Sequence, residues 1–209
     1  MSDHRKEQPN PWDQRFAVPE YVYGEDPNDF ICEIASRHLD EPMEVLCLCE
    51  GEGRNAVWLA EQGHKVTNVD LSGVALEKCR ALAASRGVEV HTIQIDMADF
   101  HAEPESADLI VLVFAHTPPH IRPHMLEQVA KALRPGGRVL LECYSPDQVG
   151  RGTGGPPVAE MMFTLDELRG IFNDWDEHHA EEVIREVLEG QLHTGEASVV
   201  QFYASKPKQ

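Results

Sequence analysis

Two glycines and one carboxylate carry the clearest chemical signal in this sequence. Gly51 and Gly53 follow the apolar run at residues 45–49 (VLCLC) and precede a helix-like segment. Glycines at such a turn allow the backbone to approach a ligand closely at the N-terminus of the helix. Asp70 ends the next strand-like run, where a carboxylate can accept hydrogen bonds from both hydroxyls of a ribose. Together these residues predict a site for a nucleoside-containing cofactor.

The sequence alternates between strand-like and helix-like segments, which is typical of a parallel sheet with helices on both faces. Strands are expected at residues 45–49, 64–70, 88–96, 107–115 and 138–145. A Gly/Pro-rich stretch follows at 146–157, and two further strands, near 177–188 and 197–205, are predicted to pair as an antiparallel hairpin. The expected fold is a doubly wound, mostly parallel α/β sheet in one domain at residues 41–209, preceded by an N-terminal cap segment at 1–40.

Composition excludes several classes of protein. The 209 residues include 36 acidic and 18 basic side chains, and the formal charge of −18 would repel a phosphate polymer because no Lys/Arg cluster outweighs it. The longest apolar run, at 109–115, is too short to span a membrane, and the N-terminus lacks the apolar segment of a secretion signal. The five cysteines lack metal-site spacing, which indicates free thiols in a reducing cytoplasm. A small-molecule substrate is therefore favoured.

Two cofactors could use the glycine turn and the acidic strand end. Gly51-x-Gly53-x-x-Ala56 matches a nicotinamide-dinucleotide fingerprint, but that motif places its first glycine directly after the strand, where this chain has Cys49. S-adenosylmethionine is favoured by Asp96, which ends the third strand and could accept from an adenine amino group, and by Met97, which could pack on the ring. The turn Pro135-Gly136-Gly137 before the fifth strand, and a hairpin in place of a second substrate domain, favour the same cofactor.

These features resemble the class I S-adenosylmethionine-dependent methyltransferases over roughly residues 44–206. The run Gly51-x-Gly53-Arg54-Asn55, followed by Trp58-Leu59-Ala60, is similar to the bacterial tellurite-resistance methyltransferase group, with thiopurine methyltransferases as more distant relatives. The N-terminal motif Trp12-Asp13-x-Arg15-Phe16 is similar to the cap segment of that group. The resemblance implies a seven-stranded sheet whose last strand is antiparallel, with S-adenosylmethionine as the cofactor. The chain departs from the family at Cys47, where Asp is usual, and at Cys49, where Gly is usual.

We expect the cofactor to lie along the carboxyl ends of the first strands. Its expected contacts are the turn residues, the two acidic strand ends and their neighbours, namely Glu50, Gly51, Gly53, Arg54, Asn55, Asp70, Leu71, Asp96, Met97 and Phe114. Arg15 is expected to pair with the carboxylate of the cofactor. A lid is expected over the site from Trp12, Phe16, Tyr21 and Tyr23. Arg151, in the loop at 150–155, is expected to belong to a second lid or to a mobile crossover. The alternative for the N-terminal aromatic residues is an arm packed on the sheet edge.

The loop at residues 116–120 (HTPPH) follows the fourth strand, where open α/β sheets bind substrates. His116 is the candidate general base, and the alternative is a loop histidine bonded to the backbone. Methyltransferases that act on nucleic-acid amino groups have an amide or carboxylate and an aromatic ring at the positions of Thr117 and His120, so base methylation is disfavoured. Prolines interrupt the regular spacing of His116, His120 and His124, and no metal site is expected.

The expected function is methyl transfer from S-adenosylmethionine to a small-molecule acceptor, such as a thiol or a chalcogen or metalloid compound. Two alternatives remain open: a nicotinamide-dependent oxidoreductase, and a non-catalytic relative that binds the cofactor without transferring a methyl group. The protein is expected in the cytoplasm as a monomer or homodimer, with no nucleic-acid or membrane partner.

Overall fold

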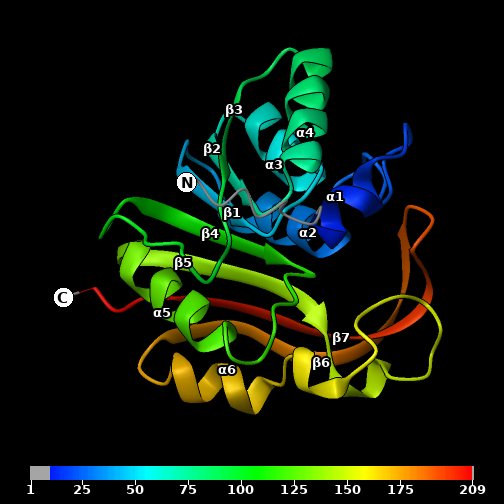
Figure 1. The fold of residues 1–209 in the computed structure, drawn as a ribbon. Helices are drawn as coiled ribbons and strands as arrows, with labels where there is room; N and C mark the ends of the chain where they lie inside the picture. The colour runs from blue at the N-terminus through cyan, green and yellow to red at the C-terminus, as the bar shows by residue number, and fades with distance from the viewer. Residues whose placement is uncertain (1–9, 209) are drawn as a thin grey trace, which may run out of the picture.

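A seven-stranded sheet forms the centre of the computed structural model, which describes residues 10–208 (Figure 1). The strands are β1 (Glu44–Leu48), β2 (Lys65–Asp70), β3 (Val90–Gln94), β4 (Ala107–Val113), β5 (Leu133–Tyr144), β6 (Asp176–Glu189) and β7 (His193–Ser205). Their order is β3-β2-β1-β4-β5-β7-β6, and β7 is antiparallel to both of its neighbours. This confirms the doubly wound, mostly parallel sheet with its antiparallel C-terminal hairpin. The first nine residues of the expected cap segment lie outside the described residues.

Helices cover both faces of the sheet (Figure 1). They are α1 (Pro11–Phe16), α2 (Asp29–His38), α3 (Arg54–Glu61), α4 (Gly73–Arg86), α5 (Arg122–Ala132) and α6 (Leu165–Ile171), with short 3-10 turns at Pro146–Gln148 and Ala159–Met161. Alternate residues of β1 point to opposite faces, so Val45 and Cys47 pack with α2 and α3 while Leu48 joins the core that contains α5 and α6. Among residues 10–208, every helix is too short or too polar to span a bilayer.

The hairpin is longer than the sequence predicts. β6 and β7 pair from one end to the other, which leaves residues 190–192 as the turn and places Gly195 inside β7. The turn contacts the N-terminal segment, because the N–H of Gln191 donates to the carbonyl of Val22 at 3.2 Å. Gly190 also packs closely on the backbone of residues 22–24. The start of β7 is thereby placed beside the N-terminal segment.

A buried group of charged and amide side chains fixes the hairpin to the start of α3. Asn28, which caps α2, donates from Nδ2 to Glu142 at 2.7 Å and to Glu189 at 2.8 Å. Arg54, the first residue of α3, forms an ion pair with Glu189. Arg185 pairs with both Glu142 and Glu189. Two guanidinium groups thus compensate two buried carboxylates, as burial of charge requires.

Candidate active site

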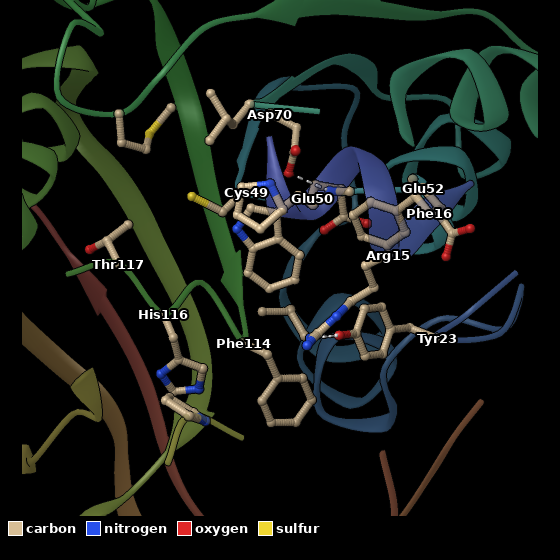
Figure 2. Close-up of a pocket in the computed structure, with 18 of the residues that line it drawn as sticks. Arg15, Phe16, Tyr23, Cys49, Glu50, Glu52, Asp70, Phe114, His116 and Thr117 are labelled. Atoms are coloured by element: carbon tan, nitrogen blue, oxygen red, sulfur yellow. Dashed lines mark hydrogen bonds between the residues drawn. The ribbon is translucent and has the colours of Figure 1, made fainter. Parts of the chain in front are cut away.

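A cavity of about 450 Å³ opens at the carboxyl ends of the central strands (Figure 2). Its walls come from the loops after these strands, from the N-terminal segment and from the start of β7. The expected cofactor residues all line it, namely Arg15, Glu50, Gly51, Gly53, Arg54, Asn55, Asp70, Leu71, Asp96, Met97 and Phe114. Three residues of the expected lid also line it, namely Trp12, Phe16 and Tyr23. The fold therefore brings segments far apart in the sequence to one edge of the sheet.

The turn between β1 and α3 has backbone angles that favour glycine. Gly51 and Gly53 have φ values of +62° and +88°. A Cβ on Gly53 would lie 2.8 Å from the Cβ of Cys79, so the turn has no room for a side chain there. Cys49 has a φ of +54°, in the left-handed region where a residue other than glycine costs about 1 kcal/mol. The backbone thus keeps a glycine-like conformation where this chain has cysteine.

Two carboxylates mark the ends of β2 and β3. One oxygen of Asp70 accepts from the N–H of Gly51 at 2.9 Å, and the other accepts from the N–H of Ser72 at 2.8 Å. Each oxygen retains a second lone pair, which suits a further donor such as a ribose hydroxyl. Burial raises the pKa of Asp70. Asp96, beside the buried Met97, is half-buried and accepts from the N–H of Ala98 at 2.9 Å.

Glu50 has a structural role that its sequence position does not reveal. Its carboxylate accepts from the N–H groups of Asn55 and Ala56, at 2.8 and 3.2 Å, and from the side-chain amide of Asn55 at 3.1 Å. These bonds cap α3, because the N-cap residue Gly53 has no side chain to do so. Burial raises the pKa of the Glu50 carboxyl. Glu50 therefore shapes the turn at the edge of the cavity.

The cavity lining carries an excess of acidic groups. Its charged side chains are the four carboxyls of Glu50, Glu52, Asp70 and Asp96 and the two guanidiniums of Arg15 and Arg54. Arg54 is paired with Glu189, whereas Arg15 donates to the Tyr23 hydroxyl at 2.9 Å and lies over the Trp12 ring at 4.9 Å (Figure 2). An acidic lining favours a cationic ligand, and Arg15 supplies a positive group that can pair with a carboxylate.

Both ring nitrogens of His116 are bonded to the backbone. Nδ1 lies 3.1 Å from the carbonyl of Met161, and Nε2 accepts from the N–H of Tyr144 at 3.2 Å, so the ring is neutral with its hydrogen on Nδ1. Burial lowers the pKa of His116 to about 4. A ring held in this way is not free to take a proton from an acceptor. The backbone-bonded alternative thus describes His116, and its assignment as a general base loses support.

His193, the first residue of β7, lines the cavity without any signal in the sequence. Its ring centroid lies 4.4 Å from that of Tyr23 and 4.7 Å from that of Phe114. The residue is 8% exposed, and its Nδ1 has no hydrogen-bond partner among residues 10–208. Burial, followed by the positive charge of Arg54, lowers its pKa to about 3. The imidazole is therefore a neutral polar group in an aromatic wall.

Comparison with known proteins agrees with this geometry. A family model described as a methyltransferase domain matches residues 45–137. A thiopurine S-methyltransferase from Vibrio cholerae serotype O1 is 26% identical over 165 residues, which are 69% of this chain and 73% of the relative. The crystal structure of TehB from Haemophilus influenzae has a TM-score of 0.70 at 17% identity, over 93% of this chain and 65% of TehB. Together these matches indicate a class I S-adenosylmethionine-dependent methyltransferase.

The cofactor of this methyltransferase is S-adenosylmethionine, in place of the nicotinamide alternative. A 1,6-didemethyltoxoflavin-N1-methyltransferase from Burkholderia thailandensis, whose crystal structure contains S-adenosylhomocysteine, has the same fold, with a TM-score of 0.61 at 22% identity. The alignment covers 85% of this chain and 76% of that protein. The acidic lining of the cavity and the free lone pairs of Asp70 fit a cationic nucleoside of this kind.

Two residues of the expected lids lie outside the cavity of the methyltransferase. The hydroxyl of Tyr21 donates to the carbonyl of Lys78 at 3.0 Å, and Tyr21 packs against α4. Arg151 pairs with Glu196 of β7 at 2.7 Å.

Within the part of the chain that the structure describes, no group of three or more His, Cys, Asp or Glu side chains is arranged to hold a metal ion.

We expect the half-buried, neutral ring of His116 to lower the stability of the methyltransferase as the pH falls from 7 to 5. Histidine has a pKa near 6.5 in an unfolded chain. Between that value and about 4, the unfolded chain binds a proton that the folded chain does not, so the free energy of unfolding falls with pH. In urea unfolding, His116→Gln should lose about 2 kcal/mol less than the wild type over this range. The exposed His120→Gln is the control, and an equal loss in His116→Gln and wild type would contradict a half-buried neutral ring.

Proposed function

We propose that the cavity binds S-adenosylmethionine along the ends of β1, β2 and β3. Asp70 suits the ribose hydroxyls, and Asp96 with Met97 suits the adenine amino group and ring. Arg15 suits the carboxylate of the cofactor. When bound, the cofactor supplies a methyl group already activated by its sulfonium. The residues of the chain then align the acceptor and exclude water, as Trp12 and other lining aromatics support.

The acceptor is proposed to bind beside Phe114 and His193. The type of acceptor is inferred from the lack of a free base at that position. His116 is bonded to the backbone, and the pKa of about 3 makes His193 a weak base. A thiol, with a pKa near 8.5, ionises appreciably at neutral pH, whereas an alcohol needs a base in the site. The site therefore favours a soft nucleophile, namely a small thiol or a chalcogen or metalloid compound.

Two further observations support a small sulfur-type acceptor. The Vibrio relative carries S-methylation of a thiopurine in its name. The formal charge of −18 opposes a nucleic-acid substrate. The proposal places the enzyme in the cytoplasm, as a monomer or homodimer without a membrane partner.

Calorimetry and a transfer assay test this proposal. Titration with S-adenosylhomocysteine should show binding, and titration with NADH should show none. Radiolabelled S-adenosylmethionine should then methylate thiophenol, an aliphatic thiol or selenite, but leave the matched compounds phenol and aniline unmodified. Binding of NADH alone would overturn the cofactor site. Equal rates with phenol or aniline would contradict the proposal that the acceptor is a soft nucleophile. Methyl transfer to structured RNA would contradict the proposal that the acceptor is a small molecule.

A further inference from the structure

One lysine of α4 ties the N-terminal segment to the turn after β1. Lys78 donates from Nζ to the carbonyls of Glu20 at 2.6 Å, Val18 at 3.0 Å and Phe16 at 3.4 Å. The same ammonium forms an ion pair with Glu52, and the two side chains are 16% and 3% exposed. An ammonium group has three hydrogens to donate, so the contacts of Lys78 with the protein account for all of its donor hydrogens.

Glu52 belongs to the turn itself, between Gly51 and Gly53. Its second carboxylate oxygen accepts from the N–H of Val22 at 2.8 Å. The carboxylate thus joins the turn to α4 and to the N-terminal segment at once. The ring of Phe16 packs on the turn, since a Cβ on Gly51 would lie 3.2 Å from its Cζ atom. Phe16 and Glu52 both lie at this end of the cavity (Figure 2).

The segment held by Lys78 also forms part of the cavity. Trp12, Arg15 and Phe16 of α1 and Tyr23 line it. Its other polar contacts include two at the start of α1, where Asp13 accepts from the hydroxyl of Ser72 at 2.6 Å and Asn10 donates to the carbonyl of Leu71 at 3.1 Å. The bonds of Tyr21 to α4 and of Val22 to the hairpin turn lie farther along the segment. Among residues 10–208, Lys78 and Glu52 form the only ion pair between the turn and α4, with Glu52 buried and Lys78 largely so.

We propose that Lys78 and Glu52 are positioning residues that hold residues 10–24 closed over the bound cofactor and so limit the rate at which the cofactor product leaves. The inference rests on the proposed cofactor position along Gly51 and Asp70. Residues of α1 line the cavity at that position, so movement of the segment would open the path for release. Loss of a buried charge pair acts mainly on dissociation rates, which is why the effect should appear in release.

The double variant Lys78→Met/Glu52→Gln tests this role. It replaces the pair by neutral side chains of similar size, so no buried charge is left without a partner. We expect S-adenosylhomocysteine to dissociate about tenfold faster in stopped-flow fluorescence, with a similar rise in Kd. The KM for S-adenosylmethionine should rise while kcat is not lowered. Amide hydrogen exchange of residues 10–24 in the bound state should also become faster.

Three comparisons make the result decisive. The exposed pair Lys65–Glu44, at the opposite edge of the sheet, supplies the control Lys65→Met/Glu44→Gln, which should behave as wild type. Lys78→Arg keeps the charge and should restore most of the slow release. Glu52→Gln alone gives the same test if the double variant does not fold. Wild-type release and exchange in a folded variant would refute the positioning role, whereas a wild-type protein that does not bind S-adenosylhomocysteine would refute the cofactor site itself.

Discussion

Replacement of Gly53 by alanine is expected to weaken the binding of S-adenosylhomocysteine by about 100-fold or more, because overpacking costs about 1 to 3 kcal/mol and left-handed strain adds to it. The backbone at Gly53 has a φ of +88°, and the new Cβ would collide with the side chain of Cys79. Relief of that collision must shift the turn, which lines the cofactor end of the cavity, or α4, which packs against the turn. Calorimetric titration of the folded variant measures the loss.

Gly63→Ala is the matched control for this variant. Gly63 has a φ of +91°, but nothing lies within 4 Å of the position its Cβ would take. Its substitution should therefore cost about 1 kcal/mol of stability from backbone strain alone and leave the affinity for S-adenosylhomocysteine unchanged. Wild-type affinity in Gly53→Ala would contradict the role of the turn, as would an equal loss of affinity in Gly63→Ala.

Replacement of His193 by phenylalanine is expected to lower kcat/KM for a thiol acceptor by about tenfold, because the neutral imidazole can offer the acceptor a hydrogen bond and such a bond contributes about 1 kcal/mol. Phenylalanine preserves the ring packing with Tyr23 and Phe114 but removes both nitrogens from the acceptor end. The affinity for S-adenosylhomocysteine should stay within about twofold, because the proposed cofactor contacts are made by other residues. Initial rates at varied acceptor concentration, with calorimetry in parallel, measure the two effects.

His178→Phe serves as the control, since His178 is exposed on β6 and bonds to the hydroxyl of Ser205. It should leave both quantities at their wild-type values. If His193→Phe transfers the methyl group as fast as wild type, the acceptor does not depend on the imidazole. If it loses cofactor affinity to the same extent as activity, His193 belongs to the cofactor end instead.

The lining of the cofactor end could be predicted from the sequence because its signals are local. A glycine turn after a strand and a carboxylate at the end of the next strand keep their meaning wherever the chain folds as an α/β sheet, and Gly51, Gly53 and Asp70 do line the cavity. The direction in which a side chain points could not be predicted in the same way. The sequence cannot distinguish a Glu50 that faces a ligand from one that caps α3, because both need a carboxylate at that position.

The acceptor end could not be predicted because it depends on long-range contacts. His193 reaches the cavity through the pairing of β6 with β7 and through the packing of Gly190 on residues 22–24. No spacing in the sequence encodes either contact. The position of His116 after β4, in contrast, is evident from the sequence. Only the structure shows that both of its ring nitrogens are hydrogen-bonded, to the backbone of Met161 and Tyr144.

The family match covers only part of the cavity lining. The family match at residues 45–137 includes the glycine turn, Asp70 and Asp96, whereas Arg15, Tyr23 and His193 lie outside it. Of these outer residues, Arg15 is proposed to pair with the cofactor, whereas His193 is proposed to contact the acceptor. Chimeras that exchange the β6–β7 hairpin, which carries His193, therefore offer an engineering route to new acceptors while Arg15, Asp70 and the glycine turn stay in place.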